Sequence, residues 1–267
     1  MSEFLYPSMQ AQMNEAEYRA VDAINYSTVK SAIHRHKTPA HYYAYELAED
    51  KPNKKQDDSM VLGSATHILV LQKERFNSLY MQSESSDKRT KTYKQDVVEN
   101  PGKTVLTPKS WDEVHLMAAS VLSHPAASFL LSVGVPEVPI FWKDPASEEP
   151  CKACVDWLRP DHHLVDLKTT HDASLNHNGF DYIVRYQQKY SWQLAHYMNG
   201  YKEITGIEPT WTFIAVENTF PFLTHVLSYS PELIAKFKAE WRNALDKYIH
   251  ARDNNWPGYS LYIEEVC

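Results

Sequence analysis

The sequence has little cysteine and little glycine, and each shortage disfavours a class of protein. Its 267 residues include three cysteines and seven glycines. Cys151 and Cys154 form a CxxC, but a zinc or iron–sulfur site needs four ligands, and the chain has no second CxxC. A structural metal site and a secreted disulfide framework are therefore both disfavoured. The scarcity of glycine argues against a flexible, low-complexity chain.

The chain also lacks long apolar runs. None approaches the roughly 18 residues of a membrane-spanning helix. The N-terminus does not show the basic-then-apolar pattern of a secretion signal. These absences predict a soluble, cytoplasmic protein that does not act at a membrane.

Two further features limit how such a chain would act on nucleic acid. It contains no GxxxxGK(S/T) pattern, which argues against an ATP-driven motor. Its formal net charge is −7, which does not suit a protein that holds polyanions by overall charge. Phosphate contacts depend on local patches, however, and bound divalent ions reverse the sign of a carboxylate cluster. We therefore expect a local concentration of basic residues.

Near the middle of the chain, two stretches are typical of facing β-strands. Residues 151–158 and 163–170 are largely apolar, and Asp156 and Asp166 interrupt them. The short turn between the stretches predicts a hairpin that brings the two acids side by side. Because alternate side chains of a strand share a face, Asp166 and Lys168 are expected to point the same way.

Two carboxylates and an ammonium at one end of a sheet suit a divalent metal ion and a water nucleophile. An acid on a strand more often belongs to a solvated face. Here the acids interrupt apolar runs, where an unpaired carboxylate is costly to bury. The cluster therefore predicts a metal-dependent phosphodiesterase site.

The order of predicted elements indicates a single α/β domain with a central mixed sheet flanked by helices. Residues 1–24 carry little pattern and are expected to be a loose segment, which leaves residues 25–267 as the folded domain. Helices are expected at 24–48 (with Ser27 as a cap and a second start at Thr38-Pro39), 59–71, 107–122, 124–131, 179–201 and 230–253, and strands at 137–142, 151–158, 163–170, 210–216 and 223–228.

Three segments of the chain match a known family in content and order: Gly63–His67, Val165–Thr170 and Trp192–Tyr197. With them the sequence resembles the PD-(D/E)xK nuclease superfamily. The most similar type within it is the exonuclease VIII (RecE) double-strand DNA exonuclease, which is related to the RecB nuclease domain and to lambda-type exonucleases. The resemblance covers about residues 25–250.

The resemblance implies a restriction-endonuclease-like core with a metal centre. Asp156 and Asp166 would be carboxylate ligands, His67 an imidazole ligand, and the Leu167 carbonyl a further oxygen ligand. Hard oxygen ligands suit Mg²⁺, and one imidazole is tolerated more readily by Mn²⁺. Lys168 would orient or help to deprotonate the attacking water, and we expect metal ions and burial to lower its pKa.

Four further residues are weaker candidates for the site. By resemblance, Gln193 and Tyr197 would brace it and contact the substrate. They lie four apart on one helix face, although a polar stripe on an aromatic helix is an alternative. Glu137 begins the strand before the hairpin, where some relatives carry a glutamate. Glu74 would share the face of His67 if that helix continues, but a solvated glutamate fits the pattern equally well.

A local basic segment does occur. It contains Lys88, Arg89, Lys91 and Lys94. Relatives of the exonuclease VIII type carry a basic segment in the corresponding region, which implies contacts to the DNA backbone that ignore sequence and weaken with salt. An ordinary solvated loop is the alternative.

The resemblance implies a Mg²⁺-dependent exodeoxyribonuclease that digests linear double-stranded DNA from its ends, in the 5′→3′ direction, during recombination or repair. It also implies a ring-shaped homo-oligomer, a single-strand annealing protein as a partner, and a bacterial or phage source. One alternative is a single-strand or structure-specific nuclease of the RecB kind or of the CRISPR-associated kind, whose members usually carry a four-cysteine cluster. The other is a non-catalytic DNA-end-binding module, against which the intact set of His67, Asp156, Asp166 and Lys168 argues.

Overall fold

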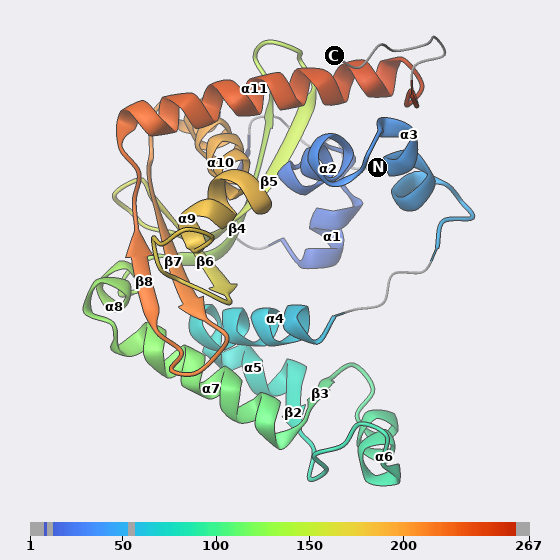
Figure 1. Ribbon diagram of the computed structural model, residues 1–267. Helices are drawn as coiled ribbons and strands as arrows, with labels where there is room; N and C mark the ends of the chain where they lie inside the picture. Colours follow the sequence, from blue (N-terminus) through green and yellow to red (C-terminus); the bar gives the residue numbers. More distant parts are fainter. Residues whose placement is uncertain (1–7, 10–12, 53–56, 260–267) are drawn as a thin grey trace.

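A computed structural model describes residues 8–9, 13–52 and 57–259. Its centre is a mixed sheet of six strands in the order β1-β4-β5-β6-β7-β8, with helices on both faces (Figure 1). Neighbouring strands are antiparallel except β6 and β7, which are parallel. The strands are Ser8–Met9 (β1), Val135–Lys143 (β4), Pro150–Leu158 (β5), His163–Thr170 (β6), Thr210–Glu217 (β7) and Thr224–Leu227 (β8). The predicted fold class is therefore confirmed.

One face of the sheet is covered by α10 (Tyr190–Thr205), α11 (Pro231–Asp253) and α2 (Tyr26–Lys30). In Figure 1, α11 lies across the top of the molecule with α10 beneath it. Gly200 allows α10 to approach β4 closely, because a Cβ at this position would lie 2.5 Å from the ring of Trp142. This face carries the larger of the two hydrophobic cores.

The opposite face is covered by α4 (Asp58–Leu71), α5 (Lys73–Leu79), α7 (Pro108–Ser123) and α8 (Pro125–Leu131). The predicted start of α7 is confirmed: Thr107 caps the helix by accepting from the Ser110 N–H, and Pro108 occupies its first turn. Side chains of β6 point alternately to the two faces of the sheet and so pack in both cores. Leu164 belongs to the first core, and Val165 and Leu167 belong to the second.

Two of the long predicted helices are broken in the structure. The region predicted as helical over 24–48 contains α2, the π-helical turn η1 (Ser31–Arg35), α3 (Pro39–Tyr42) and the π-helical turn η2 (Tyr43–Leu47). The predicted second start at Thr38-Pro39 is confirmed, because Thr38 caps α3 and Pro39 is its first residue. Its first cap is Asn25 and not Ser27, because the Asn25 side chain accepts from the Thr28 N–H at 2.9 Å. The region 179–201 is divided into α9 (Phe180–Tyr182), η3 (Ile183–Gln187) and α10.

The described part of the N-terminal segment differs from the loose segment that was expected. It contains β1, paired with β4, and the helix α1 (Glu15–Ala20), capped by Asn14. The ammonium of Lys152 on β5 donates to the carbonyl oxygens of Tyr18, Arg19 and Val21, at 3.0, 3.3 and 2.6 Å. These carbonyls lie at the C-terminal end of α1, so the buried lysine holds α1 against the sheet.

A small projection extends from the body beside α4 and α7 (Figure 1). Its base is a parallel pair of short strands, β2 (Tyr80–Gln82) and β3 (Thr104–Leu106). Between them lie residues 83–103, called the arm below, with the helix α6 (Lys91–Glu99). None of the α6 side chains is buried.

Within the described ranges, no single helix is long and apolar enough to cross a membrane. The bent pair α7 and α8 passes that test only when the two helices are taken together, across an 87° bend.

Candidate active site

The sheet is irregular at one point, and the irregularity lies where two acidic residues meet. The ladder between β4 and β5 skips the position where Glu137 faces Asp156, although the residues on both sides are paired. Glu137 has a left-handed backbone with φ 50°, which is uncommon for a residue other than glycine. In β5 the alternation shifts here, because Val155 packs in the first core and Trp157 against the second. Such irregularities redirect side chains and occur near active sites.

Asp156 connects β5 to both β6 and α4. Its Oδ2 accepts from the Leu167 N–H at 3.0 Å and lies 3.0 Å from Nε2 of His67. The β5–β6 register pairs Trp157 with Val165, and one further step places Asp156 opposite Asp166. The structure therefore brings the two acids to neighbouring strands, as the predicted hairpin requires.

His67 reaches the sheet because α4 lies close to β6. A Cβ on Gly63, one turn before His67, would lie 2.8 Å from Oγ1 of Thr169. The other ring nitrogen of His67, Nδ1, lies 3.2 Å from Oε1 of Glu137. Glu137 thus belongs to the cluster, and it and Asp156 both contact the imidazole.

Asp166 and Lys168 point from β6 toward α10. The Lys168 ammonium lies 2.5 Å from Oδ2 of Asp166 and 5.0 Å from the ring centroid of Tyr190. The other carboxylate oxygen of Asp166 accepts from Nε2 of Gln193 at 2.6 Å. The shared face of Asp166 and Lys168 and the approach of Gln193 are as the sequence predicts.

The cluster holds more acidic than basic groups, and this balance shifts their pKa values. Burial raises the pKa of Asp166, Lys168 opposes this effect, and Asp156 adds to it, so that the net pKa is about 7. Burial likewise raises the pKa of Glu137. Burial also acts on Asp156, but His67, Lys168 and the Leu167 N–H outweigh it and lower its pKa. Three carboxylates therefore share one ammonium and one imidazole.

The low pKa predicted for Lys168 presumes metal ions beside it and stays a prediction; the neighbouring acids act in the opposite direction. Burial does lower this pKa, but the charges of Asp166 and Asp156 raise it by more, and the net shift is upward. His67 follows the same balance: burial lowers its pKa, while Asp156 and Glu137 produce a net increase. The neighbouring carboxylates therefore favour the protonated form of both side chains.

The cluster has the chemistry of a divalent-metal site without the finished geometry of one. Within the described ranges, no group of three or more His, Cys, Asp and Glu side chains is already arranged to hold an ion. The donor set of carboxylates and one imidazole nevertheless suits Mg²⁺ or Mn²⁺. Oδ2 of Asp166 is buried and lacks a properly directed hydrogen bond, despite its contact with Lys168. The residues therefore fit a divalent cation, which would also neutralise the surplus charge.

The cluster opens into a cleft of about 1240 Å³. Helix α1 lines it on one side, and α4, α5 and the base of the arm contribute other walls. Tyr197 of α10 lines the cleft, whereas Gln193 is buried behind it. The other lining residues include Tyr18, Tyr26, His67, Arg75, Tyr80, Glu137, Cys154, Leu167, Lys168 and Tyr190.

Sequence reasoning missed Tyr190 and Cys154. Tyr190 lies three residues before Gln193, and this helical spacing was the signal for a shared face. Cys154 donates to Oε2 of Glu137 at 3.4 Å, and burial keeps its thiol protonated by raising its pKa. The other cysteine of the CxxC, Cys151, belongs to the core, so the two side chains lie on opposite faces of β5. Cys267 lies outside the described residues.

Some candidates lie away from the cluster. Helix α4 ends at Leu71, as predicted, so Glu74 does not continue the face of His67. Glu74 is exposed and lies outside the cleft lining, which fits the alternative of a solvated glutamate. His196 lies in the core between Trp142 and Trp241, and its ring centroid is 4.6 and 4.7 Å from the centroids of their rings.

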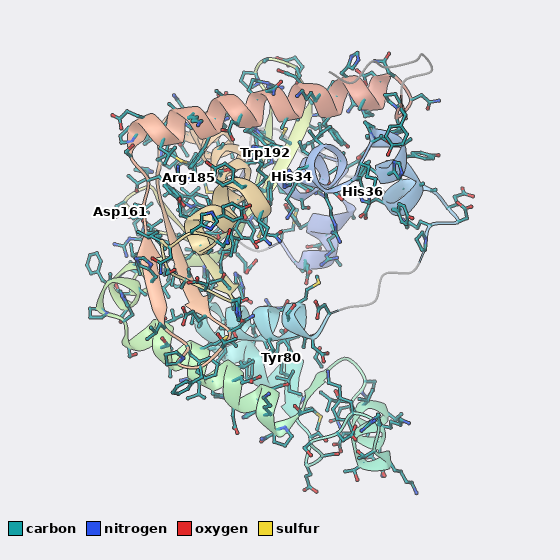
Figure 2. The ribbon with its side chains drawn as sticks, viewed as in Figure 1. His34, His36, Tyr80, Asp161, Arg185 and Trp192 are labelled. Atoms are coloured by element: carbon teal, nitrogen blue, oxygen red, sulfur yellow. The ribbon has the colours of Figure 1, made fainter. Side chains whose placement is uncertain are left out.

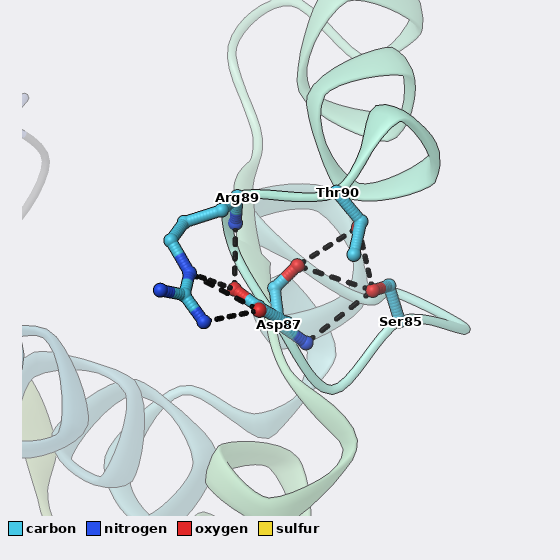
Figure 3. Close-up of polar contacts among 4 residues, drawn as sticks. All are labelled: Ser85, Asp87, Arg89 and Thr90. Carbon is cyan, nitrogen blue, oxygen red and sulfur yellow. Dashed lines mark hydrogen bonds and ion pairs between the residues drawn. The ribbon is translucent and has the colours of Figure 1, made fainter.

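The basic segment lies in the arm and is exposed. The guanidinium of Arg89 pairs with Asp87 at 2.8 Å, within a loop that Ser85 and Thr90 also stabilise (Figure 3). Lys88 pairs with Asp58 at 2.5 Å. Lys91 and Lys94 are exposed in the first turn of α6. Cations are unfavourable at this end of the helix dipole, so helix stability does not explain their position.

Comparison with known proteins agrees with this geometry. The family model of a PDDEXK-like domain of unknown function matches residues 26–266. The chain belongs to this family. Its fold is similar to that of a crystal structure from Eubacterium rectale described as "Putative exonuclease", with a TM-score of 0.68 and 13% sequence identity over 92% of this chain and 88% of the other. No curated protein matches the sequence. The PD-(D/E)xK resemblance is thus confirmed, whereas the RecE type stays a prediction.

Proposed function

We propose that this PDDEXK-like protein is a divalent-metal-dependent deoxyribonuclease that digests linear double-stranded DNA from its ends. The family and the fold support a nuclease. The observation that carries the finer proposal is the meeting of three carboxylates with His67 and Lys168 beside one cleft. His67, Asp156 and Asp166 would hold the ion, with Glu137 and the Leu167 carbonyl as further donors.

A bound Mg²⁺ or Mn²⁺ would supply an activated water and offset the charge that builds on the phosphate. The protein's own groups prepare the site for this chemistry. Gln193 fixes one oxygen of Asp166, and His67 joins Asp156 to Glu137. Lys168 lies 2.5 Å from Oδ2 of Asp166, and it would orient the attacking water or help to deprotonate it.

Several parts of the proposal depend on the resemblance alone. These are the 5′→3′ direction, the 5′-phosphate product, the role in recombination, the ring-shaped homo-oligomer and the annealing partner. The exposed positions of Lys91 and Lys94 support contact of the arm with the DNA backbone. Lys88 and Arg89 are paired with acidic side chains, so we expect them to contribute less to this DNA contact than Lys91 and Lys94 do.

Digestion of DNA substrates with different ends tests the proposal. We expect the protein to degrade linear duplex with Mg²⁺ and to leave covalently closed circles intact. In chelator it should cleave neither substrate. Equal cutting of closed circles would indicate an endonuclease, and preference for single strands would indicate the RecB kind. Binding to duplex ends without any cleavage across Mg²⁺ and Mn²⁺ concentrations would make the protein a non-catalytic end-binding module.

A further inference from the structure

Lys30, the last residue of α2, is a half-buried cation beside the candidate site. Its ammonium lies 5.4 Å from the ring centroid of Tyr26 and 5.8 Å from that of Tyr190. It donates to Oε1 of Gln188 at 3.2 Å. Among the contacts that the described residues make with Lys30, none comes from a carboxylate.

The charged groups that act on Lys30 are also positive. Burial, together with the charges of Arg35 and Lys168, lowers the pKa of Lys30 to about 8. Lys30 and Lys168 both lie over the ring of Tyr190, at 5.8 and 5.0 Å from its centroid. Lys168, however, has Asp166 as a partner. A half-buried ammonium among cations lacks the partner that normally repays its loss of water, and an anion entering the cleft would supply it.

The backbone around Lys30 is built from irregular turns. The π-helical turn η1 begins at the next residue, and η3 ends one residue before Gln188. Lys189 follows with a left-handed backbone, φ 52°. π-Helical turns and backbone strain both concentrate at functional sites.

The two irregular regions are joined to each other. The Tyr26 hydroxyl donates to the Gln188 carbonyl oxygen at 2.6 Å, and Nε2 of His34 lies 3.2 Å from the Gln187 carbonyl oxygen. Figure 2 shows His34 beside Trp192 of α10, and their rings meet edge to face. The ammonium of Lys30 is therefore held in place from both sides.

We propose that Lys30 binds a phosphate of the DNA strand in the cleft, the one next to the phosphate that is attacked, with Gln188 and Tyr190 positioning its ammonium. This inference rests on the proposed function. Tyr26 and Tyr190 line the cleft, so a strand that reaches Lys168 passes beside the rings over which Lys30 lies. The competing explanation is that Lys30 only packs its aliphatic stem on the two tyrosines.

Three variants separate these explanations. Lys30→Met keeps the stem and removes the charge, Lys30→Arg restores a charge, and Lys236→Met removes an exposed lysine from α11. The affinity of each protein for a short DNA is measured in chelator, where no cleavage occurs, at several salt concentrations. We expect Lys30→Met to bind about tenfold more weakly with a salt slope smaller by about one, Lys30→Arg to recover most of the loss, and Lys236→Met to match the parent protein.

The position of the contact is tested with DNA in which one phosphate at a time is a neutral methylphosphonate. The attacked bond is first located by mapping the products formed with metal. We expect the replacement next to that bond to weaken binding by the parent protein about tenfold and to leave Lys30→Met unaffected, because the lost contact is the same one.

Equal losses in both proteins at every position, or unchanged affinity of Lys30→Met, would overturn the inference and leave the proposed nuclease function intact. If no metal supports cleavage, no attacked bond exists, and the assignment of Lys30 to a particular phosphate fails together with the nuclease. The control is the midpoint temperature of thermal unfolding. We expect it to be the same for Lys30→Met and the parent protein, which would show that the binding loss is not a folding defect.

Discussion

The sheet and the arm both gather charged side chains, but they hold them in different ways. At the sheet, Lys168 contacts Asp166 in a buried site, and His67, which contacts Asp156, comes from a helix 89 positions earlier in the chain. In the arm, Arg89 pairs with Asp87 two residues away, and both are in contact with solvent. In this fold, dense charge along the sequence marks a solvated surface, whereas single charges within apolar segments converge on the site.

The largest difference between the two regions is expected in catalysis. Lys168→Met removes the ammonium from the carboxylate cluster, and we expect the rate of cleavage to fall on the order of 10³-fold. Lys91→Met removes an exposed charge of the arm and is the matched control, with a rate at saturating protein close to that of the parent. Single-turnover cleavage of linear duplex with Mg²⁺ gives both numbers.

Asp166→Ala should lose cleavage to a similar degree while DNA binding in chelator persists. If either Lys168→Met or Asp166→Ala keeps more than about a tenth of the parent rate, the roles given to these residues are wrong.

A second test displaces His67 without substituting any residue of the carboxylate cluster. In Gly63→Val the new side chain meets Thr169 and pushes α4 away from β6, which displaces His67 from Asp156. Small displacements of catalytic groups are costly, so we expect about 10²-fold slower cleavage. Gly258→Ala is the control, because its Cβ would lie 3.7 Å from that of Ala40, an ordinary contact. A normal rate for Gly63→Val would show that the approach of α4 to the sheet is not needed.

The third test concerns the pH dependence of the free energy of unfolding. His196 is buried beside the sheet with its pKa lowered to about 4, mainly by burial. Its pKa in the unfolded chain is near 6.5, so as the pH falls from 6.5 toward 4 the unfolded chain binds a proton that the folded protein does not. Stability contributed by neutral His196 is therefore present above pH 6.5 and lost as the pH falls, by up to about 3 kcal/mol.

Chemical unfolding at pH 7.0 and 4.5 measures this effect as the difference between the parent protein and His196→Gln. The variant should be less stable at pH 7.0 and should lose less stability on acidification, because it lacks the titrating ring. The exposed His115 gives the control His115→Gln, which should keep the pH dependence of the parent. Equal pH dependence of the parent and His196→Gln would contradict the assignment.

The order of helices and strands could be predicted, and so could the placement of Asp156 and Asp166 on neighbouring strands, because both depend on local sequence patterns. The apolar runs of β5 and β6 and the caps Thr107 and Ser230 are visible in the sequence, and the structure contains them. The face shared by Asp166 and Lys168 follows from strand geometry alone.

The remaining features depend on tertiary contacts. The skipped pair of Glu137 and Asp156 arises from a left-handed backbone that no local residue pattern requires. The break before α10 likewise lies at a left-handed lysine, Lys189, and not at a glycine or proline. The upward effect of Asp166 on the pKa of Lys168 also could not be predicted, because it depends on the distance between the two side chains.

The smallest effect is expected from the arm itself. In the double variant Lys91→Ala, Lys94→Ala, two exposed cations are lost without breaking any ion pair that the structure describes. If the arm contacts DNA phosphates, the affinity for duplex should fall several-fold and the salt slope by up to about 2, while the cleavage rate at saturating protein stays unchanged. Lys88→Ala, whose ammonium is already paired with Asp58, should weaken binding less than either lysine of α6. Unchanged affinity and salt slope of the double variant would make the arm an ordinary solvated surface, and the contrast with the sheet would then be complete.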